Sequence, residues 1–556
     1  MDRRAALSTL LARSSRQERE APRVLHTGLA PYTGPWGFQQ ASHLLRRGMF
    51  GPTYAQIKWA VQQGRQATVN KLFEDLPLPA PPVNAYYTDD PGVPIGATWV
   101  NAVYPGINTG AEMGYRGRSL ISWLVGNFWE EGMSIRQKLT LFWHNHFPIA
   151  EILDAKLRYK YYHLLNSYAW GNFRELTKAM TIDPSMLRYL NGNRNTNTAP
   201  NENYARELLE LFTIGKGPAV GPGDYTNYTE HDVMEIARAL TGWRDFGSNA
   251  TSGDGSVGAN FNPNQHDTGT KTLSYRFNNV VIPNLGEQEY AHVIDIIFQQ
   301  DEVARYICRR LYQWFVYYEI TEEAEVNVIE PMAQILISND YQIRPALMAL
   351  LSSEHFFDPE NYGVMIKNPW DFIMSALKSL EVQYSQPLAQ RYDSWYSFFG
   401  RARQMQMEYF NIPDVAGWKA YFLAPQYYRN WISASTLPHR MQLTDRLIAA
   451  GESPFQANGQ LMRVNVLALI QTLDNPSDPN AVVEEFSRIL HPKPLTDGQK
   501  DALKAILLPG LPDFEWTVEY GQYAQNPTNS ALASAVEAKL RALLKAMLSM
   551  PEFYLS

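Results

Sequence analysis

Two histidines separated by one residue are the first candidates for metal chemistry in this chain. His144 and His146 lie in the segment 142–148, where the spacing of apolar residues predicts a helix. In a continuous helix their rings lie about 200° apart, so they could share one metal only if the helix unwinds. Pro148 favours such unwinding because it disfavours helical geometry at Phe147. Imidazole suits zinc, iron, copper or nickel. The alternative is that His146 is a hydrogen-bonded core histidine and that His144 lies near the surface.

A carboxylate on the apolar side of a predicted helix is the second candidate. In the helix expected at 201–214, Glu207 falls within an apolar stripe. Burying an unpaired carboxylate is costly, so Glu207 needs a cation, a metal or a proton. We therefore predict that Glu207 is a metal ligand or a general base. The alternative is a buried salt bridge to an arginine of another helix. The stripe consists of Tyr204, Leu208 and Leu211.

A polar segment in an irregular part of the chain supplies the third candidate. His266, Asp267 and Lys271 lie within six residues, and loops often carry functional side chains. We predict that His266 is a metal ligand and that Asp267 orients a ligand histidine. The alternative is a turn in which Asp267 caps the backbone and Gly269 adopts a positive φ.

The elements that must position these residues are mostly helical. Helical periodicity dominates residues 114–214 and returns between 287 and 382. Residues 244–282 are rich in Gly, Asn, Ser and Thr, which predicts a long loop. The expected fold is mainly α, a multi-helix globular array with long irregular loops and at most a small β-hairpin. Its expected parts are an N-terminal extension or remnant export signal (1–36), a main helical domain (37–382) and a C-terminal helical part packed on the first (383–556).

Composition excludes several classes of protein. The chain has 556 residues, of which 45% are hydrophobic and 19% charged, so a sizeable core is expected. The net charge of −7 and the lack of a basic run argue against a nucleic-acid partner. The single cysteine, Cys308, excludes an intramolecular disulfide and a cysteine-based zinc site. No apolar stretch approaches the length of a transmembrane helix. The common nucleotide-binding, protease and hydrolase motifs are also missing.

The N-terminal segment can be interpreted in two ways. Arg3 and Arg4 precede the short apolar run 5–12, which resembles the start of a twin-arginine export signal. Arg13 and Arg16 interrupt that run, and no small-residue cleavage site follows. A signal would place the protein in the periplasm or outside the cell. The alternative, a short amphipathic helix, would leave it in the cytoplasm.

Seven segments of the chain occur in a characteristic order: HLLRRGMFG (43–51), FWHNHF (142–147), PNENYAREL (200–208), ARALTGW (237–243), HDTGTK (266–271), KNP (367–369) and PDVAGW (413–418). Together they resemble the bacterial family called domain of unknown function 1800. The similarity covers about residue 37 to the C-terminus. It implies a bacterial protein, often exported, whose gene often lies beside that of a sulfatase-like exported protein. His231 stands where the family usually has alanine, so no shared role is expected for it.

Two functions follow from these residues. The first is a metal-dependent hydrolase acting on an extracellular or envelope substrate, a small molecule or a glycan, with a divalent transition metal as cofactor. The second is a non-catalytic helical scaffold or partner of a sulfatase-like exported protein, in which the polar residues form buried networks. A glycosidase pair is disfavoured, because Glu202 and Glu207 lie about 140° apart on one helix. In the hydrolase, the metal ligands are His144, His146 and His266, and the catalytic residues are Glu207 and Asp267.

Overall fold

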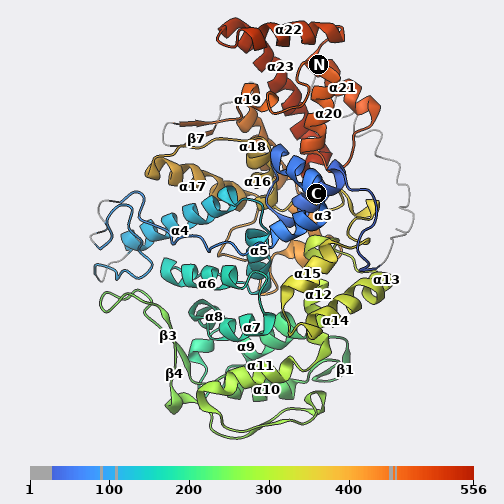
Figure 1. Cartoon of the computed structure of the whole chain (residues 1–556). Coiled ribbons are helices and arrows are strands. Elements are labelled where there is room, and N and C mark those ends of the chain that lie inside the picture. Colours follow the sequence, from blue (N-terminus) through green and yellow to red (C-terminus); the bar gives the residue numbers. More distant parts are fainter. Residues whose placement is uncertain (1–27, 88–89, 91, 107–109, 450–454, 458–459) are drawn as a thin grey trace.

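The fold is mainly α, as predicted. The computed structural model describes residues 28–87, 90, 92–106, 110–449, 455–457 and 460–556. Helices dominate this part of the chain, and the strands are short (Figure 1). None of the described helices is long and apolar enough to cross a membrane.

The N-terminal half of the chain contributes helices that begin at well-formed caps. Thr53 and Gln56 form a reciprocal capping box at the start of α3. The carboxylates of Asp154 and Asp183 accept backbone N–H groups at the starts of α6 and α8. Ser134, just before α5, accepts a hydrogen bond from Arg136 N (3.1 Å). The elements are α2 (Phe38–Gly48), α3 (Tyr54–Leu72), α4 (Gly110–Glu130), α5 (Arg136–His146), α6 (Ala155–Ser167), α7 (Phe173–Thr181), α8 (Pro184–Tyr189), η1 (Gly192–Arg194), α9 (Glu202–Glu207), the π-helix η2 (Leu208–Thr213) and α10 (Glu230–Ala239).

The C-terminal half adds a second set of helices. The helical chain between 322 and 338 contains a π-helical turn, η6. The α- and π-helices are α11 (Glu289–Ile297), α12 (Asp301–Phe315), α13 (Glu322–Ala324), η6 (Glu325–Ile329), α14 (Glu330–Ser338), α15 (Ile343–Leu351), α16 (Pro369–Ser379), α17 (Leu388–Gln404), α18 (Thr436–Ile448), α19 (Val466–Ile470), α20 (Pro479–Leu490), α21 (Asp497–Leu507), α22 (Asp513–Gln525) and α23 (Ser530–Ser549). Short 3₁₀ turns are η3 (Pro263–Gln265), η4 (Tyr275–Phe277), η5 (Gly286–Gln288), η7 (Pro359–Asn361), η8 (Lys419–Tyr421), η9 (Tyr427–Trp431) and η10 (Pro551–Tyr554).

The described strands form four two-stranded antiparallel pairs. Two of them lie in or beside the segment 244–282, where at most one hairpin was expected. Trp243 begins β3 after the chain turns at Gly242 (φ +98°). The pairs are β1 (Ala219–Gly221) with β2 (Asp224–Tyr225), β3 (Trp243–Phe246) with β4 (Gly258–Phe261), β5 (Lys271–Thr272) with β6 (Val281–Ile282), and β7 (Phe455–Ala457) with β8 (Gln460–Met462).

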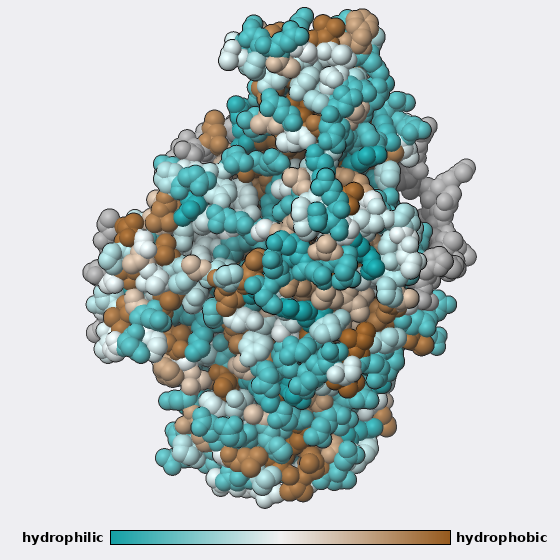
Figure 2. Space-filling model, viewed as in Figure 1, coloured by the Kyte–Doolittle hydropathy of each residue, from teal (hydrophilic) through white to brown (hydrophobic). Residues whose placement is uncertain are grey.

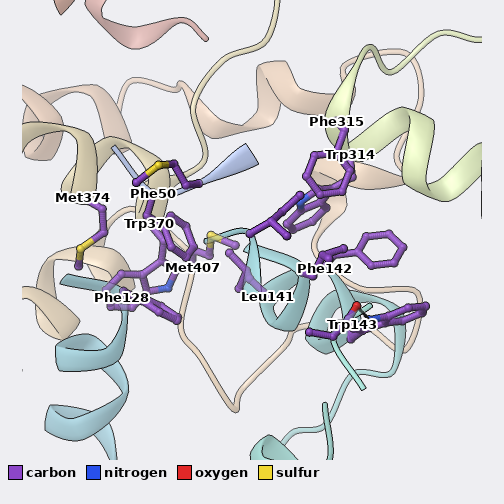
Figure 3. Packing of buried hydrophobic residues seen from close by; sticks show 14 of the residues in the cluster. Phe50, Phe128, Leu141, Phe142, Trp143, Trp314, Phe315, Trp370, Met374 and Met407 are labelled. Carbon is purple, nitrogen blue, oxygen red and sulfur yellow. Dashed lines mark hydrogen bonds between the residues drawn. The ribbon is translucent and has the colours of Figure 1, made fainter. Parts of the chain in front are cut away.

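Helix α5 lies within the main hydrophobic core. All its residues from position 137 to 146 are buried, polar ones included. Figure 3 shows Phe142 of α5 near Trp314 of α12, with ring centroids 5.6 Å apart. In the same core, Phe128 of α4 meets Trp370 of α16 at 5.4 Å. A helix buried on all sides must satisfy its polar side chains inside the protein.

Residues 28–36 pack against the helical body. Tyr32 N donates to Ser352 O (2.8 Å), and Trp36 Nε1 donates to Ala60 O (3.0 Å). These contacts tie the chain before α2 to α15 and α3.

The remaining part of the predicted extension, with Arg3 and Arg4, lies outside the described residues. One hydrophobic cluster includes residues on both sides of position 382. The division between 37–382 and 383–556 stays a prediction.

Candidate functional site

His144 belongs to a buried hydrogen-bond chain. Phe410 N donates to His144 Nε2 (3.0 Å), so the proton of the neutral ring is on Nδ1. Nδ1 then donates to the hydroxyl of Tyr161 (2.8 Å), which donates to Phe147 O (2.5 Å). Burial lowers the pKa of His144 well below its usual value. His144 is fully buried, contrary to the expectation of a surface position. Both ring nitrogens are therefore bound to protein groups.

His146 lies in a separate, aromatic environment. Its Nε2 donates to Phe212 O (2.9 Å), a carbonyl of the π-helix η2. Burial lowers the pKa of His146 to about 3, and the charge of Arg310 adds to this effect. The other nitrogen, Nδ1, is buried without a hydrogen-bond partner among the described residues. The predicted alternative, a hydrogen-bonded core histidine, describes this geometry. The surrounding rings belong to Phe142, Trp143, Phe147, Phe173, Phe212 and Tyr306.

Helix α5 continues through both histidines and leaves helical geometry only at Phe147, so the unwinding between the histidines that a shared metal would require is not seen. Their rings consequently point to different partners, as the helical geometry requires.

His266 belongs to a third network. Its Nδ1 faces Thr241 O (3.0 Å) and Thr241 Oγ1 (3.2 Å). The Thr241 hydroxyl donates to Arg238 O (2.7 Å), so it accepts from the histidine. Nε2 faces Glu289 Oε2 (3.2 Å). Both nitrogens of His266 therefore face oxygen atoms of the protein, and neither faces an open position for a metal.

A fully buried ion pair extends this network. Lys271 Nζ lies 2.5 Å from Glu289 Oε1, and both side chains are completely inaccessible. Lys271 also donates to Asp267 O. Leu285 N donates to Glu289 Oε2 (3.1 Å). The HDTGTK motif thus fixes its long loop to α11 through Glu289.

Asp267 is bound by an arginine of α10. Arg238 Nε lies 2.8 Å from Asp267 Oδ2, and Gly269 N donates to Asp267 Oδ1 (2.8 Å). Partial burial raises the pKa of Asp267, but the Arg238 hydrogen bonds outweigh it and the net pKa is lowered. Asp267 caps the turn, as the alternative proposed. Gly269 does not adopt a positive φ. Its lack of a side chain instead makes room for Arg238, because a Cβ at this position would lie 2.8 Å from an Nη atom of Arg238.

Among the five predicted site residues, Glu207 has a charge that neighbouring groups compensate least. It is half-buried at the last position of α9, before η2. Burial, followed by the charges of Glu210 and Asp414, raises the pKa of Glu207, although Arg206 lowers it. Glu207 forms no ion pair with a described residue, so the expected salt bridge is not seen. Arg206 instead pairs with Glu202 (3.1 Å) and Glu230 (2.7 Å).

The structure therefore brings His266 and the neighbouring Asp267 into one network, whereas His144, His146 and Glu207 have other partners and surroundings. Within the described part of the chain, no group of three or more His, Cys, Asp or Glu residues could hold a metal ion. The metal role of the three histidines, and the catalytic roles of Glu207 and Asp267, stay predictions without a common site. The five are His144, His146, His266, Glu207 and Asp267.

Comparison with known proteins identifies the family. The chain matches the family described as "Protein of unknown function (DUF1800)" over residues 43–555. The chain belongs to the DUF1800 family. No curated protein and no solved structure is significantly similar to it.

Several family motifs meet in the fold. Asn145 Oδ1 accepts a hydrogen bond from Trp418 N (2.9 Å), which joins FWHNHF to PDVAGW. Gly417 has φ +100°, and a Cβ there would lie 2.5 Å from Asn145 Oδ1, so this position requires glycine. This DUF1800 contact joins segments more than 250 residues apart in the sequence.

The sequence did not reveal the residues whose side chains form hydrogen bonds with the motif histidines. Tyr161 and Glu289 belong to none of the seven motif segments. Tyr161 lies on the buried face of α6, and Glu289 begins α11, where an acidic residue is expected for helix-dipole reasons alone. No local signal distinguishes Glu289 from an ordinary first-turn acid.

Replacing Glu207 with glutamine is expected to stabilise the protein at neutral pH. A raised pKa in the folded state means that folding disfavours the charged carboxylate, and this cost is present above the folded pKa. The gain should be on the order of 0.5 kcal/mol, because solvent screens a half-exposed group. It should disappear below the ordinary pKa of 4.5.

Urea unfolding at neutral and at acidic pH measures this difference. Glu202→Gln, which removes a carboxylate paired with Arg206, is the control and should give no gain. A loss of stability in Glu207→Gln at neutral pH would mean that Glu207 has a stabilising partner.

Proposed function

We propose that this DUF1800 protein is a non-catalytic helical scaffold that binds a partner protein through helix α22. The distribution of the predicted site residues supports this proposal. Their hydrogen bonds join α5 to α6, α10 to its following loop, and that loop to α11. Such networks fix helix packing without requiring a reaction.

The observation that carries the proposal is an apolar stripe on the outer face of α22. Trp516 and Tyr520 are buried on its inner face, towards the body of the protein. Phe514 and Val518, one turn apart on the other face, are 60% and 49% exposed. Leu511, just before the helix, is 47% exposed. Helices that are apolar on both faces are normally buried.

The position of α22 suits an interaction with another protein. It lies at the outer end of the molecule (Figure 1), where the surface view shows apolar atoms in brown (Figure 2). Exposed apolar side chains grouped on one helix face are typical of protein-binding sites. The partner that we propose is the sulfatase-like exported protein implied by the family resemblance.

Phe514→Ser combined with Val518→Ser is expected to abolish this interaction. Removing two central apolar anchors should reduce recovery of the co-expressed sulfatase-like protein by about tenfold or more. Affinity purification of this chain with quantification of the bound partner measures the effect.

Val326→Ser is the matched control, because Val326 is 62% exposed on η6 and should leave recovery unchanged. The proposal would be rejected if the α22 double variant recovered as much of the sulfatase-like protein as the unmodified chain does. It would also be rejected if the unmodified chain recovered none.

A metal-dependent hydrolase is the second candidate. It is favoured by Glu207, a half-buried carboxylate without an ion-pair partner among the described residues and with a raised pKa. The hydrogen bonds of His144 and His266 count against their use as ligands. Metal analysis of protein purified without chelator distinguishes the two functions, since a bound catalytic metal should approach one equivalent and less than about a tenth would favour the scaffold.

A further inference from the structure

A surface pocket lies where the end of α6 and the start of α7 meet the turn between α14 and α15. Its volume is about 320 Å³, close to the lower limit for small-molecule sites. This volume admits a small organic molecule rather than a peptide or a large cofactor. The residues that line the pocket are Ser167, Trp170, Gly171, Gln342, Arg344 and Pro345.

Backbone hydrogen bonds join the two walls of this pocket. Arg344 N donates to Trp170 O (3.2 Å), and Ile343 N donates to Gly171 O (3.0 Å). These contacts tie the segment before α7 to the first turn of α15, so the side chains of Trp170 and Arg344 project from a fixed backbone. The pocket is therefore formed before any ligand binds, as is usual for small-molecule sites.

A strained turn precedes Gln342 in the pocket wall. Asp340 and Tyr341 have φ values of +51° and +60°. Non-glycine residues in this left-handed region are costly and persist only where surrounding contacts fix them. Asn172 Nδ2 donates to Asp340 O (2.6 Å), and Asn172 also forms an antiparallel bridge with Gln342. Backbone strain that is held in this way is concentrated at binding and catalytic sites.

A carboxylate beside the pocket balances the charge of Arg344. Arg344 pairs with Asp75, whose Oδ1 also accepts from the indole N–H of Trp170 (3.2 Å). The Arg344 hydrogen bond lowers the pKa of Asp75, so this carboxylate is ionised at neutral pH. Arg344 is the only charged residue that lines the pocket, so a ligand with a net charge has no unbalanced partner there.

The other lining side chains offer donors and acceptors but little apolar surface. The exposed Gln342 amide can both donate and accept. Ser167 Oγ donates to His163 O (2.7 Å) and can still accept. The guanidinium of Arg136 lies 4.6 Å from the centroid of the Trp170 ring, and only 7% of Trp170 is exposed. A purely apolar ligand would leave these polar groups without water or partners, which is costly.

We propose that this pocket binds a neutral sugar, either free or as one unit of a glycan. The hydroxyl groups of a sugar both donate and accept, which matches the Gln342 amide and the Arg344–Asp75 pair. Its C–H groups can contact Pro345 and the exposed part of Trp170. No residue of this pocket belongs to α22, so the proposal is independent of the proposed function.

Saturation-transfer difference NMR tests the proposal with glucose, mannose and N-acetylglucosamine, each supplied also as a linear tetrasaccharide. At least one monosaccharide should bind with a Kd on the order of 1 mM, as expected for about 12–15 non-hydrogen atoms. Tighter binding of the tetrasaccharide would identify a glycan as the ligand, whereas equal affinities would identify the free sugar. Glucuronate, which carries a net charge, should bind no better than glucose.

Two variants assign the signal to the pocket. Gln342→Trp should abolish binding, because the larger side chain fills the pocket from its exposed wall. Arg344→Met removes a charged donor and should raise Kd by about tenfold. Gln334→Trp is the matched control, since Gln334 is exposed on α14 and does not line the pocket, and it should keep the Kd of the unmodified chain.

Three results would overturn the proposal. They are the absence of saturable binding for every sugar tested, equal binding by Gln342→Trp and the unmodified chain, and stronger binding of glucuronate than of glucose. Circular dichroism of each variant shows whether it is folded, and both substituted side chains lie at the protein surface.

Discussion

Glu289→Ala is expected to lower the free energy of unfolding by about 3–5 kcal/mol, because it leaves the buried Lys271 ammonium without its partner. The substitution also removes an acceptor from His266 and one from Leu285 N. Urea-induced unfolding followed by circular dichroism measures the loss. The adjacent Glu287→Ala, outside this network, should change stability by less than about 0.5 kcal/mol.

A double variant separates the cost of the broken pair from the value of the pair itself. Lys271→Met combined with Glu289→Met removes both charges and should recover much of the loss, because buried pairs replaced together by apolar residues are often nearly neutral. A stability of Glu289→Ala close to that of the unmodified chain would contradict the buried pair.

His144→Phe is expected to lower the free energy of unfolding by about 3 kcal/mol. The ring shape is kept, but the buried N–H of Phe410 and the hydroxyl of Tyr161 each lose a hydrogen-bond partner. Because His144 acts through protein hydrogen bonds, chelator should not change the stability of the unmodified chain. The same urea unfolding, with and without chelator, measures both effects.

His163→Phe serves as the control, since His163 is exposed on α6 and should tolerate the change. A chelator-induced loss in the unmodified chain that is absent from His144→Phe would instead support the predicted metal role.

Local information in the sequence predicted much of the fold. The mainly α class follows from apolar spacing, and the helix starting after Thr53 follows from a capping box within four residues. The helices at 155–167 and 173–181 begin after the side-chain caps Asp154 and Asn172. The sequence did not reveal η2, because a π-helical turn depends on the surrounding packing rather than on local propensity.

The candidate site was predictable only in part. The alternative for His146, a core histidine, could be predicted from the sequence because the residue shares a helix face with Phe142 and Trp143. The acceptor of the His146 ring, Phe212 O, could not be predicted because it lies 66 residues away in the sequence, on η2. The alternative for Glu207, a salt bridge to an arginine of another helix, is not seen among the described residues, and Arg206 of its own helix pairs with Glu202 and Glu230.

The sequence by itself determined which segments become helices and which family the chain belongs to, because both depend on residues close together in the chain. Only the tertiary structure decided what the motif histidines bind. Hydrogen bonds and ion pairs act over about 3 Å, and their partners come from distant elements. His266 therefore meets Glu289 and His144 meets Phe410, contacts that no spacing of residues along the chain encodes.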